Sequence, residues 1–127
     1  AIIMLEDDLI VSKSFYRYAI QSVNFYAKDS NIAGISLYSY RIAETVYRPF
    51  IPVQDDSDIY FMKVPSSWGQ IWTKEQWLLF RNWYNENAYT KQDFKNQLPP
   101  NVLKWPESSW KKYFYMYLIL LLNLLLH

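Results

Sequence analysis

The sequence predicts an α/β fold in which helices flank a mixed, mostly parallel sheet. Three observations predict it. Residues Ile2–Leu5 form an unbroken apolar run, which is typical of a strand buried on both faces. Apolar side chains then recur every three or four positions over about 14–28, as in an amphipathic helix. Residues Ile32–Tyr38 alternate and are rich in β-branched and aromatic side chains. This strand–helix–strand order favours a βαβ unit with parallel pairing.

Composition limits the domain organisation and the chemistry. The 127 residues suit a single domain over 1–127, and 51% hydrophobic content with 20% charged residues argues against disorder. The net charge of +1 without a basic cluster excludes an electrostatic nucleic-acid binder. There are no cysteines, which is compatible with a cytoplasmic location, and the one histidine is His127. Catalysis must therefore depend on carboxylates, lysine, tyrosine or a metal held by oxygen ligands.

The first helix and the middle of the chain carry weaker signals. Ser12 or Ser14 could cap the helix over 14–28. Residues Tyr40–Asp58 lack periodicity and are predicted to form a long loop, which in a compact domain is usually functional or mobile. Residues Ile59–Val64 are predicted as a short strand, and residues 65–69 as the turn that follows it.

The C-terminal third begins with a clear helix signal. Thr73 is the expected N-cap of a helix over about 74–86. Residues 85–106 are polar and look like a connector with one helical turn. The tail over 110–127 is strongly apolar but shorter than the roughly 20 residues that span a bilayer. Three interpretations stay open for it: a packed helix, an interfacial helix that contacts a membrane peripherally, or an abnormal end of the chain.

The sharpest chemical feature is the acidic triplet Glu6-Asp7-Asp8 at the end of the first predicted strand. Adjacent carboxylates repel one another, and a bound divalent cation would remove that cost. Oxygen-rich ligands suit Mg²⁺ or Mn²⁺. Side chains alternate along a strand, so Glu6 and Asp8 would share a face while Asp7 points away. The triplet alone is equally compatible with a solvated acidic turn that caps the following helix.

Three segments together resemble the GT-A-fold glycosyltransferases. Residues 2–9 with the triplet resemble the metal-motif region, residues 32–36 the strand that follows, and residues 67–77 a Trp-Gly segment near the acceptor site. The resemblance is closest to bacterial family-2-type enzymes, and more distant to N-acetylglucosaminyltransferases that carry a Glu-Asp-Asp motif. It covers roughly residues 1–84, and the order and spacing of the three segments agree.

The resemblance implies a partial GT-A fold and a metal-dependent transfer of sugar from a nucleotide-sugar donor, with a UDP-sugar favoured, to a saccharide or lipid-linked acceptor. It further implies synthesis of a bacterial surface polysaccharide. In that family the last Asp of the motif contacts Mn²⁺ or Mg²⁺, which corresponds to Asp8. Glu6 would assist at the metal and Asp7 at the donor ribose. The metal would neutralise the diphosphate leaving group.

Related inverting enzymes use a later carboxylate as general base, often in an acidic pair after a Trp. Here Trp110 is followed by Lys111-Lys112, so that residue has no counterpart. The substitutes are acidic side chains elsewhere in the chain, each of which also fits a solvated loop position: Glu107, Asp55, Asp56 and Asp58.

Three tryptophans of the Trp-Gly segment could stack on sugar rings. Trp68 is the acceptor-site candidate, because it precedes Gly69, where backbone can approach a ligand closely. Trp72 and Trp77 are spaced for packing of the turn onto the helix, so we assign them to the core.

GT-A enzymes also have a nucleotide-binding half before the acidic motif, which is expected to precede residue 1 here. Without cover on both faces, the strand Ile2–Leu5 is expected to promote self-association. The rival interpretation is a non-catalytic α/β interaction or membrane-docking module that does not bind a donor.

Overall fold

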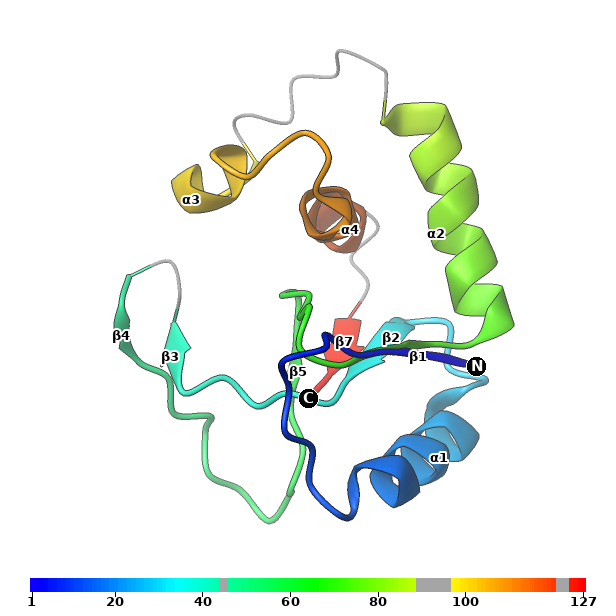
Figure 1. Ribbon diagram of the computed structural model, residues 1–127, viewed down its shortest axis with the longest axis vertical. Helices are drawn as coiled ribbons and strands as arrows, with labels where there is room; N and C mark the ends of the chain where they lie inside the picture. Colours follow the sequence, from blue (N-terminus) through cyan, green and yellow to red (C-terminus); the bar gives the residue numbers. More distant parts are fainter. Residues whose placement is uncertain (44–45, 89–96, 121–123) are drawn as a thin grey trace.

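The computed structural model describes residues 1–43, 46–88, 97–120 and 124–127. The described residues form seven strands and four helices (Figure 1). In chain order they are β1 (Ile2–Met4), α1 (Phe15–Tyr26), β2 (Ile32–Ser36), β3 (Ile42–Ala43), β4 (Arg48–Pro49), β5 (Phe61–Met62), β6 (Gln70–Trp72), α2 (Lys74–Asn87), α3 (Pro100–Leu103), α4 (Trp110–Leu120) and β7 (Leu124–Leu126). The α/β class is therefore confirmed.

The main sheet is mostly antiparallel, so the prediction of a mostly parallel sheet is wrong. Its strand order is β1-β6-β2-β7-β5, and β2 with β7 is its parallel pair. The remaining neighbours, β1 with β6, β2 with β6 and β5 with β7, run antiparallel. The cause is β6, which lies between β1 and β2. These two strands therefore point the same way, as a βαβ unit requires, but each pairs with β6 instead of with the other.

Helices cover both faces of this sheet. Figure 1 shows α1 on one side, and α2 and α4 on the other. Successive strand side chains alternate between the two layers. Ile71 of β6 packs with Ala19 of α1, whereas the next residue, Trp72, packs with Phe80 of α2 and Phe114 of α4. The core is thus split into two apolar layers by the sheet.

The first strand is less buried than its sequence predicts. β1 is an outer strand of the sheet, and Ile2 is 56% exposed. Ile3 and Met4 are half-buried, and Leu5 follows the strand as an exposed residue. Within the part of the chain described here, β1 is therefore only partly covered, and the self-association expected from missing cover stays a prediction.

The two longest predicted helices are confirmed. Thr73 caps α2 with a full capping box: its hydroxyl accepts from the Gln76 N–H, and the Gln76 side chain accepts from the Thr73 N–H. Ser14 occupies the N-cap position of α1 but makes no side-chain cap bond. The helical turn expected between 85 and 106 is α3, while residues 89–96 of that connector lie outside the described residues.

The predicted long loop over 40–58 is partly wrong. β3 and β4 form an antiparallel hairpin within it, with Ile42 opposite Pro49. Residues 50–58 contain no helix or strand, as expected. The strand predicted over 59–64 is present as β5, although shorter.

The apolar tail is a buried helix followed by a strand, so its interpretation as one helix is only half correct. Phe114 and Leu118 of α4 and Leu125 and Leu126 of β7 have no exposed surface. The helix length and apolarity that a bilayer crossing requires are not found in any of the described helices. Among the described apolar side chains of the tail, those of residues 114–118, 125 and 126 are buried, whereas Trp110, Tyr113, Ile119 and Leu120 are half-buried.

Candidate functional site

The end of β1, the end of β2 and the beginning of β6 meet at one edge of the sheet. Because β6 runs opposite to both neighbours, Gln70 at its start pairs with Met4 and with Ser36. The Gly69 carbonyl accepts a hydrogen bond from the Leu37 N–H at 2.8 Å. The acidic turn after β1 and the Trp-Gly segment before β6 are therefore neighbours, although about sixty residues separate them in the chain. We call this region the carboxyl edge.

The acidic turn carries the predicted metal ligands. Glu6, Asp7 and Asp8 are all exposed, and the turn has no regular secondary structure. Leu5 and Leu9, which flank the triplet, line a pocket of about 290 Å³. The three exposed carboxylates lie in the chain between these two lining residues, although none of the three lines the pocket itself, which we call the edge pocket.

The acidic turn is compatible with a cation that arrives together with phosphate. No group of three or more His, Cys, Asp or Glu side chains able to hold a metal forms among the described residues. Mg²⁺ in nucleotide sites usually takes one or two carboxylates, with phosphate oxygens and waters as its other ligands. One or two exposed carboxylates on this turn satisfy that requirement.

Aromatic rings form part of the wall of the edge pocket, together with aliphatic side chains such as Ile10 and Leu37. Tyr38 and Trp68 meet edge to face, with ring centroids 4.7 Å apart. The backbone N–H of Trp68 donates a hydrogen bond to the Ser66 hydroxyl at 3.1 Å. This bond stabilises the turn that carries the Trp68 ring. Trp68 is nevertheless 40% exposed, so part of the ring is open to a ligand. Tyr38 was not among the predicted site residues, since only the strand pairing reveals its position.

The backbone conformation explains why residue 69 is a glycine. Its φ is +101°, a conformation that side chains with a Cβ rarely adopt. A Cβ at this position would also lie 2.7 Å from the Leu37 Cβ. The glycine therefore allows β6 to start close against the end of β2, which positions Trp68 at the carboxyl edge.

His127 reaches the carboxyl edge from β7, which runs parallel to β2. Its Nδ1 lies 3.2 Å from the Tyr38 carbonyl oxygen and its Nε2 lies 3.2 Å from the Val64 carbonyl oxygen. The imidazole stacks on Tyr60, with centroids 5.4 Å apart. A neutral imidazole can donate to only one of these two carbonyls. Burial lowers the pKa of His127, and the two carbonyl contacts offset this only in part.

The stability of the fold is expected to depend on this histidine. The pKa of His127 is depressed from its usual 6.5, so the free energy of unfolding should fall as the pH drops below that value. The unfolded chain then binds a proton that the folded chain resists. Urea unfolding of the wild type and of His127→Phe, which keeps the stacking but cannot titrate, should be compared between about pH 5 and pH 8. Identical pH profiles for the two proteins would contradict this assignment.

The acidic loop before β5 lies along a different hollow. Asp55 and Asp58 line an open groove of about 930 Å³ that does not include the residues flanking the acidic turn. Asp55 Oδ1 accepts from the Ser57 N–H at 2.8 Å, and Asp56 is exposed. The sheet ends in β1 on one side and β5 on the other, so the structure does not bring these carboxylates together with the acidic triplet.

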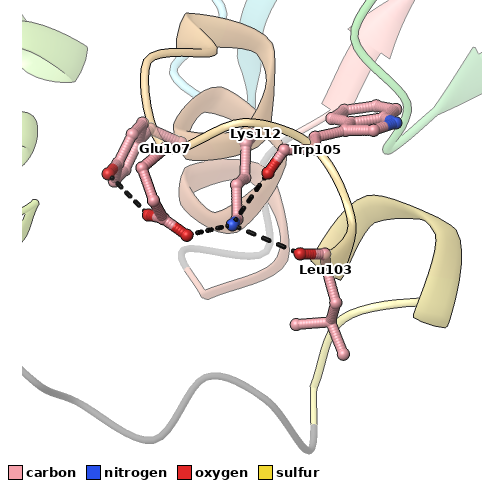
Figure 2. A network of polar contacts seen from close by, with 5 residues as sticks. Leu103, Trp105, Glu107 and Lys112 are labelled. Atoms are coloured by element: carbon pink, nitrogen blue, oxygen red, sulfur yellow. Dashed lines mark hydrogen bonds and ion pairs between the residues drawn. The ribbon is translucent and has the colours of Figure 1, made fainter.

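Glu107 belongs to a polar network between α3 and α4 (Figure 2). Its Oε1 accepts from Lys112 Nζ at 2.6 Å and its Oε2 accepts from the Tyr113 hydroxyl at 3.2 Å. Hydrogen bonds from Lys112 and then Tyr113 lower the pKa of Glu107. A general base works best with a pKa near the operating pH. With both oxygens engaged and its pKa lowered, Glu107 is poorly suited to act as a general base.

Of the remaining tryptophans of the Trp-Gly segment, Trp72 lies in the core as predicted, whereas Trp77 is half-buried against it. Trp72 is 3% exposed, and Trp77 packs against it with ring centroids 5.5 Å apart. The exposed Trp68 is therefore the member of the three that can meet a ligand at the carboxyl edge.

Comparison of the chain with protein-family models, with curated proteins and with solved structures found no match. The residues of the carboxyl edge are therefore the basis for inferring a function.

Proposed function

We propose that this chain is part of a GT-A-type glycosyltransferase, which transfers a sugar from a nucleotide-sugar donor to a saccharide or lipid-linked acceptor. One observation carries the proposal: an exposed acidic turn and an exposed tryptophan lie next to each other at the ends of β1 and β2. Ligands of α/β proteins bind at the carboxyl ends of strands. The charged diphosphate of a donor would bind at the carboxylates through a metal ion, and the apolar face of a sugar would pack on the tryptophan. A transferase needs both kinds of side chain next to each other.

On the donor side, the acidic turn would bind the diphosphate through Mn²⁺ or Mg²⁺. Asp8 and Glu6 would hold the ion, and Asp7 would contact the donor sugar or ribose. When bound, the ion supplies Lewis-acid stabilisation of the leaving diphosphate. The exposure of all three side chains leaves them able to meet such a ligand.

On the acceptor side, Trp68 would place an apolar face of the sugar against its ring. Its contact with Tyr38 and its turn hydrogen bond to Ser66 hold the ring in position, so little ordering would be needed on binding. Among the general-base candidates Glu107 is the least suited, because both of its oxygens already accept hydrogen bonds. Asp55 and Asp58 line a separate groove and Asp56 lies in the same loop, so none of these three predicted carboxylates is placed beside Trp68 and the acidic triplet.

The proposal predicts Mn²⁺-dependent binding of UDP. Calorimetry should show UDP binding to the wild type when Mn²⁺ is present. In Asp8→Asn the affinity should fall at least about tenfold, ~1.4 kcal/mol, because the substitution keeps the size of the side chain and removes its charge.

Asp56→Asn is the matched control, since it removes the same charge from another exposed position. It should bind UDP like the wild type. Equal losses in the two variants would overturn the assignment of Asp8 to the donor site. No Mn²⁺-dependent binding by the wild type would mean that these residues do not form a donor site by themselves, and it would favour a non-catalytic interaction module.

A further inference from the structure

A hollow of about 320 Å³ lies between α2 and the residues around the start of α4. Its volume is at the lower end of the roughly 300–1,000 Å³ that small-molecule sites occupy. Aromatic rings and polar side chains both line it. The rings include those of Trp77, Tyr84 and Trp110, and the polar side chains are those of Arg81, Asn85 and Ser108. We call it the α2 hollow.

Two of its rings are held in place by the core. Trp72 is 3% exposed, and its ring centroid lies 5.5 Å from that of Trp77 and 5.4 Å from that of Trp110. Trp77 and Trp110 are themselves half-buried, so part of each side chain stays open to the α2 hollow. Because the buried Trp72 fixes both indoles, a ligand that packs on them would need little ordering of the protein.

Arg81 gives the α2 hollow an accessible positive charge. It is exposed, and the helix neighbours at positions 77, 78, 84 and 85 are not acidic. Among the described residues, no ion pair to its guanidinium forms. Glu107 precedes the lining residue Ser108 in the chain, but it is paired with Lys112 at 2.6 Å. A guanidinium matches the geometry of a carboxylate, which it can bind through two parallel hydrogen bonds.

We propose that the α2 hollow binds an acidic saccharide, that is, a pyranose ring that carries a carboxylate. The apolar C–H face of the ring packs on the indole of Trp77 or Trp110, and Arg81 binds the carboxylate. Asn85 and Ser108 are exposed side chains that can donate and accept hydrogen bonds, so they serve the ring hydroxyls. An aromatic acid without hydroxyls would leave these two side chains unused, which favours a saccharide.

This site does not depend on the proposed glycosyltransferase activity. None of the acidic triplet and neither Trp68 nor Tyr38 lines the α2 hollow. β6 begins at the carboxyl edge and runs away from it, and α2 follows the far end of that strand. The α2 hollow and the carboxyl edge are therefore separate places on the protein.

Methyl glucuronide and methyl glucoside form a matched pair of probes, since a carboxylate in the first replaces the hydroxymethyl group of the second. Ligand-observed NMR titrations at neutral pH should show that the wild type binds the glucuronide about three- to tenfold more tightly. This is the size expected for one charge-assisted contact at an exposed position. Protein NMR spectra should show shifts of the Trp77 and Trp110 indole N–H signals on addition of the glucuronide.

Two variants test the charge. Arg81→Gln should remove the preference and keep glucoside binding, because the amide can form hydrogen bonds but carries no charge. Arg17→Gln is the matched control, since it removes the same charge from an exposed position on α1, which covers the other face of the sheet (Figure 1). It should keep the preference of the wild type.

A third variant separates a saccharide from an aromatic acid. Asn85→Leu should weaken binding of methyl glucuronide about threefold or more and leave benzoate unchanged, because benzoate has no hydroxyl group. Equal losses for the two ligands would overturn the choice of a saccharide.

Four other results would overturn the proposal as a whole: no binding of either sugar, equal binding of the two by the wild type, a preference that persists in Arg81→Gln, or the same loss in Arg17→Gln. Indole shifts confined to Trp68 would also overturn it, because they would place the sugar at the carboxyl edge.

Discussion

Replacing Phe114 with alanine is expected to lower the free energy of unfolding by about 3–5 kcal/mol. Phe114 is fully buried at the centre of the layer between the sheet, α2 and α4. Its ring centroid lies 4.8 Å from that of Phe80 and 5.4 Å from that of Trp72. Truncation removes both contacts and opens a cavity that three elements share. Urea unfolding followed by tryptophan fluorescence would measure the loss.

Phe25→Ala is the matched control, because it is the same substitution at a position that is 80% exposed. Its effect should stay within about 0.5 kcal/mol. If both alanine variants unfolded at the same urea concentration, the packing of α4 onto the sheet described above would be incorrect.

Replacing Lys112 with methionine is expected to destabilise the protein by about 2–4 kcal/mol. Lys112 is 4% exposed, and its Nζ donates to the Leu103 and Trp105 carbonyl oxygens as well as to Glu107 (Figure 2). Methionine keeps the length of the side chain but leaves both carbonyls without this donor. Unfolding in urea would again provide the measurement.

Two further variants separate the carbonyl contacts from the ion pair. The Glu107 side chain is 81% exposed, so Glu107→Gln should cost less than about 1 kcal/mol. Lys74→Met, at an exposed position on α2, should be close to neutral. A loss in Glu107→Gln as large as that in Lys112→Met would show that the ion pair, and not the carbonyl contacts, holds the α3–α4 connection.

The sequence was most informative where short-range signals decide the structure. Thr73 with Gln76 three residues later predicts the start of α2, and the capping box is present. The apolar stripe over 14–28 likewise predicts α1. Both depend on interactions between residues three or four positions apart, which a sequence displays directly.

Two strands of the main sheet, β6 and β7, were missed because their neighbours come from far along the chain. β6 contains only Gln70, Ile71 and Trp72, which is too short for an alternation to be recognised. β7 continues a leucine-rich run, and leucine favours helices, so nothing local marks the change from α4. The predicted sheet was mostly parallel because β6 was absent from it.

In the candidate site, too, features set by nearby residues could be predicted from the sequence, whereas features set by long-range strand pairing could not. The position of the acidic triplet at the end of a strand follows from the apolar run before it, and the structure confirms that position. Tyr38 and His127 could not be assigned, because they join the edge through the pairing of β2 with β6 and β7. The sequence identifies Glu107 as a candidate carboxylate, but its ion pair with the buried Lys112 is seen only in the structure.

The position of β7 between β2 and β5 has a consequence for synthesis on the ribosome. Both of these strands pair with β7, and β5 ends at Met62, about sixty residues before β7 begins. At about 5–20 residues per second, a ribosome needs roughly 3–12 s to make that stretch. During this interval the facing edges of β2 and β5 have no partner in the nascent chain, and they are the surfaces where a chaperone would act.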